Sequence, residues 1–144
     1  MSLYNFEKSI DTIDRDHVYF KLFLGKEYTY DNINSYNCGF MTDEAMELIE
    51  DIFLDFNSDY DHWGITRYDE SQIKGIERKL LERLEKLNNN CTINILRNNW
   101  FSDDWREILQ NIYTENRNEL IIFFSKIVEW FGQIKEKNLI VIGI

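Results

Sequence analysis

The stretch Leu139-Ile140-Val141-Ile142-Gly143-Ile144 contains no charged or polar side chain. A strand that is apolar at every position, and not only at alternate positions, is typical of the interior of a β-sheet, where both faces are covered. We therefore predict that residues 139–144 form an interior strand of a sheet on which the rest of the chain packs.

Two other stretches favour strands. Residues 18–24, Val-Tyr-Phe-Lys-Leu-Phe-Leu, are rich in the aromatic and β-branched residues that strands prefer, and Gly25 ends the run. Residues 92–96, Thr-Ile-Asn-Ile-Leu, are predicted as another strand on the same grounds. We also expect residues 28–30 to pair with the strand at 18–24, and residues 31–40 to form a loop.

A helix is predicted over about residues 43–57. Thr42 is suited to cap its first turn, and the acidic residues that follow are favoured at the positive end of the helix dipole. Apolar residues then recur at helical spacing, which indicates an amphipathic helix. The acidic residues expected on its outer face are Glu47, Glu50, Asp51 and Asp55.

A second helix is predicted over about residues 70–88, where apolar residues follow one another at steps of three and four. Asp69 and Gln72 have the spacing of a capping box. The three asparagines 88–90 are expected to end this helix. The ion pairs expected at four-residue spacing are Glu70–Lys74 and Glu82–Lys86.

Two more helices are predicted between residue 102 and residue 134. Ser102, followed by two aspartates, is expected to open the first, and residues 116–118 to separate it from the second. The second helix is apolar around much of its circumference, which favours packing on two sides or an interface. The order of elements predicts an α+β fold, a small mixed β-sheet with about four helices packed on it, in a single domain over residues 1–144.

The net charge is −10, from 16 basic and 26 acidic residues. This charge repels nucleic acid, and the basic residues are scattered among acidic neighbours, so we expect neither a nucleic-acid partner nor a membrane partner. No apolar run approaches the ~20 residues of a membrane-spanning helix, and no signal peptide is evident. The two cysteines are far apart, which favours a reduced cytoplasmic protein.

Residues 59–70 have the length of a calcium-binding EF-hand loop. Asp59, Asp61, Gly64 and Glu70 occupy the loop positions one, three, six and twelve that such a site uses. Trp63 and two other residues depart from the pattern. A divalent-metal site at Asp59, Asp61 and Glu70 is therefore an alternative. The principal interpretation is a polar turn formed by Asp59 and Asp61, with Trp63 packed into the core and Asp69 capping the helix at 70–88.

Catalytic motifs are absent from the sequence, which has no nucleophile elbow, zinc motif or glycine-rich phosphate loop. His17 and His62 each follow an aspartate and could serve as a general base, but surface or half-buried positions are the commoner outcome for such residues. Cys38 has no positive neighbour that would activate its thiol. We expect no cofactor, and an enzyme whose site is assembled from distant residues stays open as a further alternative.

The densest charge feature is the acidic run from Asp43 to Asp61, in which no lysine or arginine occurs. Like charges on one face destabilise a helix, and a cationic partner would relieve that cost. Aromatic residues beside acids also favour a binding surface, with Trp105 more suited to core packing. The predicted contacts for a partner are Glu47, Glu50, Asp51, Asp55, Asp59 and Asp61, with Trp63 or Trp100 as an apolar anchor.

In size, acidity and lack of a catalytic motif, the chain resembles the small immunity proteins that neutralise bacterial toxins. This resemblance covers the overall character of the chain and no motif, so it assigns no residue. It implies a non-catalytic protein-binding module whose acidic surface meets the basic surface of a toxin domain. The oligomeric state is left open by the sequence.

Overall fold

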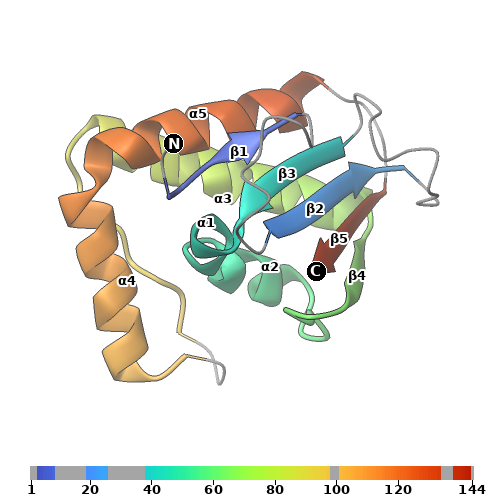
Figure 1. Ribbon diagram of the computed structural model, residues 1–144, viewed down its shortest axis with the longest axis horizontal. Helices are drawn as coiled ribbons and strands as arrows, with labels where there is room; N and C mark the ends of the chain where they lie inside the picture. Colours follow the sequence, from blue (N-terminus) through green and yellow to red (C-terminus); the bar gives the residue numbers. More distant parts are fainter. Residues whose placement is uncertain (1–2, 9–18, 26–37, 98–100, 134–137, 144) are drawn as a thin grey trace.

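The structure is a computed structural model that describes residues 3–8, 19–25, 38–97, 101–133 and 138–143 (Figure 1). The expected pairing of residues 28–30 and the expected loop over 31–37 lie outside these ranges, as do His17 and Trp100. Among the described residues the chain forms five strands and five helices.

The strands are β1 (Phe6–Glu7), β2 (Tyr19–Leu24), β3 (Cys38–Thr42), β4 (Ile65–Tyr68) and β5 (Leu139–Gly143). The helices are α1 (Asp43–Glu47), α2 (Glu50–Phe56), α3 (Glu70–Asn88), α4 (Asp103–Glu115) and α5 (Arg117–Gln133).

The five strands form one sheet in the order β1-β3-β2-β5-β4. The apolar strand β5 pairs with β2 on one side and with β4 on the other, so the interior position predicted for residues 139–144 is confirmed for the described part. The combination of this sheet with helices confirms the predicted α+β class. All the described pairings are antiparallel, so the described sheet is antiparallel and not mixed.

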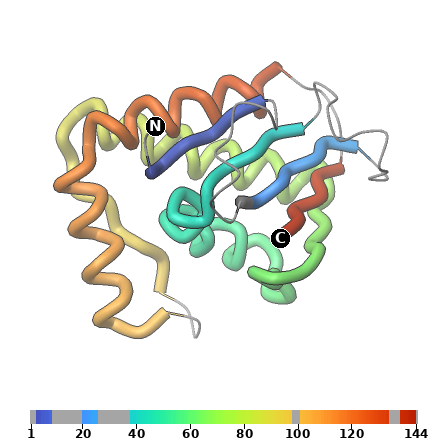
Figure 2. Tube along the Cα trace, in the orientation of Figure 1, coloured from blue at the N-terminus to red at the C-terminus, as the bar shows by residue number. Residues whose placement is uncertain are grey.

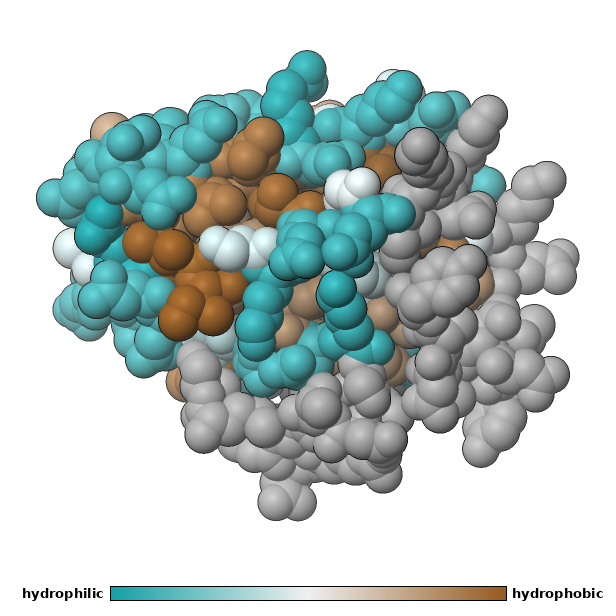
Figure 3. Space-filling view, turned by 90° about the horizontal axis from the view of Figure 1, so that it is seen from above, coloured by the Kyte–Doolittle hydropathy of each residue, from teal (hydrophilic) through white to brown (hydrophobic). Residues whose placement is uncertain are grey.

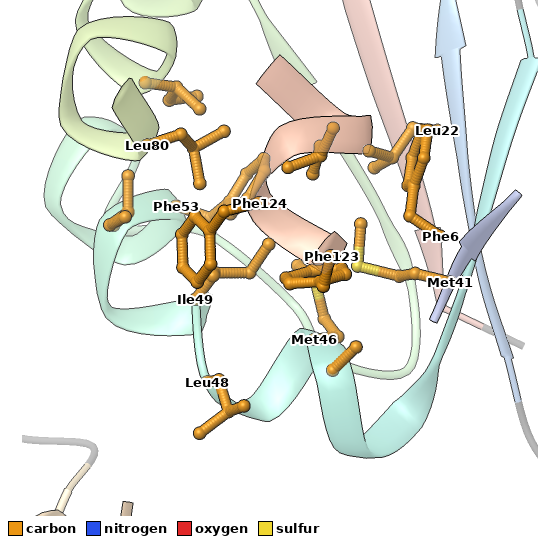
Figure 4. Close-up of a cluster of buried hydrophobic side chains, with 14 of the residues drawn as sticks. Phe6, Leu22, Met41, Met46, Leu48, Ile49, Phe53, Leu80, Phe123 and Phe124 are labelled. Carbon is orange, nitrogen blue, oxygen red and sulfur yellow. The ribbon is translucent and has the colours of Figure 1, made fainter. Parts of the chain in front are cut away.

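The main core lies between one face of this sheet and the helices. Strand β2 directs Phe20, Leu22 and Leu24 into it, and α5 contributes Phe123 and Phe124 from the opposite side (Figure 4). Helices α3 and α5 run alongside each other, whereas α4 projects from the end of α5 (Figures 1 and 2). The apolar arc predicted for the last helix is therefore used within the chain, where one side packs on the sheet and another on α3.

The other face of the sheet carries a second, smaller apolar cluster. Its members are Phe23, Cys38, Phe40 and Ile140, with Ile142 packed against them. These residues alternate with the core residues along β2, β3 and β5, as the two-residue period of a strand requires. Cys38 and Phe40 lie in β3, so the prediction of a loop up to residue 40 is wrong at its end.

The predicted helix at 43–57 is divided into α1 and α2. The amides of Leu48 and Ile49 bond to carbonyl oxygens three residues earlier, at 3.2 and 2.9 Å, instead of four. Both side chains are fully buried, which directs the chain inward at the break. The carbonyl oxygen of Leu48 accepts hydrogen bonds from Arg83 and Tyr113, so tertiary contacts replace the helical bond there.

Helix α3 has the boundaries and pairs that the sequence predicts. The capping box of Asp69 and Gln72 is present, and so are both four-residue ion pairs, at 3.5 Å each. The chain leaves the helix through Asn90 with a positive φ of 56°, a conformation that asparagine tolerates. The helix is therefore determined by local sequence.

The predicted strand at 92–96 is wrong. This segment has no strand partner among the described residues, and side chains satisfy its backbone instead. The amide of Leu96 donates to Asp51 at 2.7 Å, and the carbonyl oxygen of Ile95 accepts from Arg106 at 3.1 Å. A strand-like composition alone does not provide a neighbouring strand.

The described surface is mainly hydrophilic when seen from above, with a group of hydrophobic side chains toward one side (Figure 3). Within the described ranges, no helix has both the length and the apolar character needed to cross a membrane.

Candidate functional site

The turn between α2 and β4, residues 57–64, is held by hydrogen bonds from its own side chains. Asn57 organises its first half: its side-chain oxygen accepts from the amide of Asp59 at 3.0 Å, and its side-chain nitrogen donates to the carbonyl oxygen of Arg67 at 3.1 Å. The amide of Tyr60 donates to the carbonyl oxygen of Asn57 at 3.1 Å. One asparagine thus joins the turn to the edge strand.

Asp61 organises the second half of the turn. Its carboxylate accepts from the amide of Trp63 at 3.0 Å, and its own amide donates to the hydroxyl of Thr66 at 3.1 Å. The turn also joins the end of β5, because the amide of Gly143 donates to the carbonyl oxygen of Gly64 at 2.9 Å. A side chain at Gly143 would overlap the carbonyl oxygen of His62, so this close approach requires glycine.

The turn presents an apolar patch to solvent. Trp63 is 67% exposed and Ile65 is 59% exposed, values that are unusual for such large side chains on a well-bonded segment. Asp59 and Asp61 are exposed beside them. We call these four residues, Asp59, Asp61, Trp63 and Ile65, the Trp63 surface.

Beneath Trp63, His62 points inward and is 8% exposed. Its Nε2 lies 3.0 Å from Oδ1 of Asp43 in α1, and its Nδ1 is in close contact with Oε1 of Glu50 in α2. The ring also packs edge-on against Phe20 and Trp63, with centroid distances of 4.8 and 4.6 Å. His62 therefore joins two helices, strand β2 and the exposed tryptophan.

Glu50 is 3% exposed, and two side chains satisfy it. One is His62, and the other is Tyr60, whose hydroxyl donates to Oε1 of Glu50 at 2.9 Å. Burial raises the pKa of Glu50, although the hydrogen bond and the positive charge of His62 oppose this rise. Burial, followed by the charge of Glu50, raises the pKa of Tyr60 well above its ordinary value, so the phenol stays a donor.

Glu47 is the half-buried neighbour of this group. Burial first, and then the charges of Asp43 and Glu50, raise the pKa of Glu47 to about 7. Oδ1 of Asp43 makes the 3.0 Å ion-pair contact with His62 but accepts no well-aligned hydrogen bond, and the buried Oε2 of Glu44 has no hydrogen-bond partner among the described residues. The carboxylates of α1 are thus less well compensated than Glu50. We call Asp43, Glu47, Glu50, Tyr60 and His62 the His62 cluster.

Asp51, the next residue after Glu50, has a different environment. It is 1% exposed, and both its oxygens are bonded to the guanidinium of Arg83 in α3. Arg83 also donates to the carbonyl oxygen of Leu48 and to the hydroxyl of Tyr113, at 3.1 and 3.2 Å. Burial raises the pKa of Tyr113 to about 12, so the phenol remains protonated and donates to Leu48 at 2.6 Å. We call Asp51, Arg83 and Tyr113 the Arg83 cluster.

The predicted acidic face is therefore corrected at two positions. Glu50 and Asp51 are buried and bonded within the chain, because the break at residues 48 and 49 turns the start of α2 into the core. Of the other predicted contacts, Glu47 is half-buried, and Asp55, Asp59, Asp61 and Trp63 are exposed. Trp105 is partly buried and packs against the core, as expected.

The calcium alternative finds no support in the geometry. No group of three or more histidine, cysteine, aspartate or glutamate side chains in the described part of the chain could hold a metal ion. Residues 65–68 form β4, which separates the turn from Glu70, and Glu70 pairs with Lys74 at 3.5 Å. Oδ1 of Asp61 accepts a hydrogen bond from the backbone amide of Trp63 at 3.0 Å.

The buried ring of His62 links the carboxylates of Asp43 and Glu50. A general base needs a free ring nitrogen to accept a proton, and here both nitrogens face carboxylates. Sequence reasoning named His62 and Glu50, but it did not connect them or include Asp43 and Tyr60. Asp43 and Glu50 lie 19 and 12 positions before His62 in the chain, and no local signal links them to it.

Comparisons of the chain with models of protein families, with curated proteins and with solved structures gave no match.

Proposed function

We propose that this chain is a non-catalytic protein-binding module that docks a basic partner on the Trp63 surface. The observation that carries the proposal is the 67% exposure of Trp63 on a turn fixed by hydrogen bonds on both sides. Exposed tryptophan is costly in water and is strongly enriched among the residues that dominate binding energies. A turn already held in one conformation loses little entropy on binding.

Charge gives the class of partner. Asp59 and Asp61 are exposed four and two residues before Trp63, and the net charge of the chain is −10. Such a surface attracts lysine- and arginine-rich proteins and accelerates their association, whereas it repels nucleic acid. The resemblance of type to immunity proteins favours a toxin domain, whose basic substrate-binding face would meet the acidic side chains while Trp63 fills an apolar recess.

The test is capture of a binding partner from an extract at low salt by immobilised protein, with identification of what is retained. We expect a basic protein whose retention falls with added salt and with heparin, a polyanion that competes for cationic surfaces. Trp63→Ala should reduce affinity by at least about 30-fold, because loss of a central aromatic anchor costs about 2 kcal/mol or more.

Charge reversal distinguishes binding through the Trp63 surface from nonspecific attraction to the overall negative charge of the chain. The double variant Asp59→Lys/Asp61→Lys should abolish retention. The matched control is Glu85→Lys/Glu107→Lys, which makes the same change in net charge at exposed positions of α3 and α4. Equal loss in both double variants, or retention that ignores Trp63, would contradict the proposal.

A further inference from the structure

The protonation state of His62 bears directly on the Trp63 surface, because the histidine and the tryptophan are consecutive and their rings pack together. A neutral imidazole has one N–H group and one nitrogen lone pair. Here Nδ1 contacts Glu50 and Nε2 lies 3.0 Å from Asp43. Only the doubly protonated, positively charged ring offers a proton to both carboxylates.

We propose that His62 is a proton switch for the Trp63 surface: its charged ring ties the 57–64 turn to α1 and α2, and loss of the proton releases the turn. This inference deepens the proposed function, since it concerns regulation of the same surface. Histidine is the side chain whose charge ordinarily changes near physiological pH.

The charged groups that face His62 are all acidic: Asp43 and Glu47 from α1 and Glu50 from α2. Tyr60 of the turn is a neutral phenol and donates to Glu50. Strand β2 contributes the ring of Phe20 and β5 contributes Gly143, and neither titrates. Among the described residues, His62 is therefore the positive group in a cluster of carboxylates.

The sign of the effect follows from charge. A charged His62 ring balances part of the negative charge of the cluster, and a neutral ring does not. As pH rises, Glu47, with a pKa of about 7, gains a negative charge. The cluster then becomes more negative, the carboxylates repel each other, and one nitrogen lone pair of a neutral ring faces a carboxylate. The turn should loosen as pH rises.

The experiment measures hydrogen exchange of the amides of Gly64 and Gly143, and the ring resonances of His62, by NMR between pH 5.5 and pH 8.5 on the intact protein without any partner. Gly64 and Gly143 report the turn, whereas Ile76 and Leu80 of the buried face of α3 serve as internal controls. Protection factors are taken after division by the intrinsic exchange rate at each pH.

We expect protection of the two turn amides to fall at least about tenfold across the titration of the His62 ring, because a hydrogen bond to a charged group contributes a factor of ten or more. The controls should change little. A turn that loses protection at the same rate as α3, or at a pH unrelated to the ring titration, would overturn the proposal.

His62→Gln provides the second arm, because glutamine keeps a hydrogen-bond donor and has no titratable charge. Its turn amides should be weakly protected at every pH, without the transition of the wild type. A transition that persists in this variant would count against His62 and in favour of another group. The wild-type titration tests the switch without the variant. Because no partner is needed, failure of the switch and failure of the proposed binding function are separate results.

Discussion

Glu50 and Asp51 are consecutive acidic residues, both are buried, and each lies against one basic side chain from another part of the chain. Asp51 meets Arg83, whose guanidinium is permanently charged and matches both carboxylate oxygens. Glu50 meets His62, which is shared with Asp43 and carries a charge only when it is protonated. Two neighbouring buried carboxylates thus form different ion pairs: the pair with Arg83 is always charged, whereas the pair with His62 is charged only when the histidine is protonated.

The surroundings follow the same division. The Arg83 cluster joins α2, α3, α4 and the 91–97 segment. The His62 cluster lies directly beneath that surface, beside carboxylate oxygens that have no hydrogen-bond partner among the described residues. No buried side-chain atom of Asp51, Arg83 or Tyr113 lacks a hydrogen-bond partner, whereas buried oxygens of Asp43 and Glu44 accept no hydrogen bond from the described residues.

The largest effect is expected from breaking the Arg83 cluster. Arg83→Met should lower the free energy of unfolding by about 3–5 kcal/mol, because it leaves the Asp51 charge buried without its partner. Urea denaturation measures this change. The double variant Asp51→Leu/Arg83→Met should be more stable than Arg83→Met alone, since no buried charge is left unpaired. A single variant that costs less than about 1 kcal/mol would show that the cluster is not a structural fastening.

A smaller effect compares the two tyrosines. Tyr113→Phe removes the donor to Leu48 and should cost about 1–2 kcal/mol at any pH from 6 to 9, because the pKa of Tyr113 is about 12. Tyr60→Phe removes the donor to Glu50 and should cost about 1 kcal/mol, increasing with pH as Glu50 ionises. Thermal unfolding at several pH values tests the pair. If the stability losses of the two variants changed with pH in the same way, the proposed difference between the Arg83 cluster and the His62 cluster would be wrong.

The smallest effect concerns Glu47. Its raised pKa means that the folded state binds a proton more tightly than the unfolded chain between pH 4.5 and about 7, so stability contributed at low pH is lost as pH rises through that window. Glu47→Gln should therefore remove part of this decline and stabilise the protein at pH 8 by about 1 kcal/mol, a value reduced for solvent screening. Glu85→Gln, at an exposed position of α3, is the control and should leave the profile unchanged.

Local signals predicted those elements whose stability is local. The capping box at Asp69 and the apolar spacing that follows fix α3, and the fully apolar run at 139–143 places β5 inside the sheet. Residues 92–96 show the limit of such signals, because strand composition there meets no strand partner in the described structure, and Asp51 and Arg106 bond its backbone instead. The edge strand β4 was missed because it is short and lies within a turn-like sequence.

The candidate site divides in the same way. Asp59, Asp61 and Trp63 were named from the sequence as candidate contacts of a partner, and the structure places all three on the surface of one turn. The accompanying expectation that Trp63 packs into the core is wrong, because its side chain is 67% exposed. Glu50 and Asp51 were assigned to the same outer face, but they are buried, because the break between α1 and α2 depends on Arg83 and Tyr113, which are 32 and 62 or more residues away in the chain. No helical periodicity contains that information.

By itself, the sequence determined the α+β class, the interior strand β5, helix α3 with its cap, and the concentration of acidic residues between positions 43 and 61. These features depend on composition and on spacings within one or two turns of the chain. The tertiary structure decided which acids are exposed, which are bound to Arg83, and which meet His62. The physical reason is the cost of burying a charge: a carboxylate is stable in the core only where a cation or a hydrogen-bond donor, here distant in the chain, compensates it.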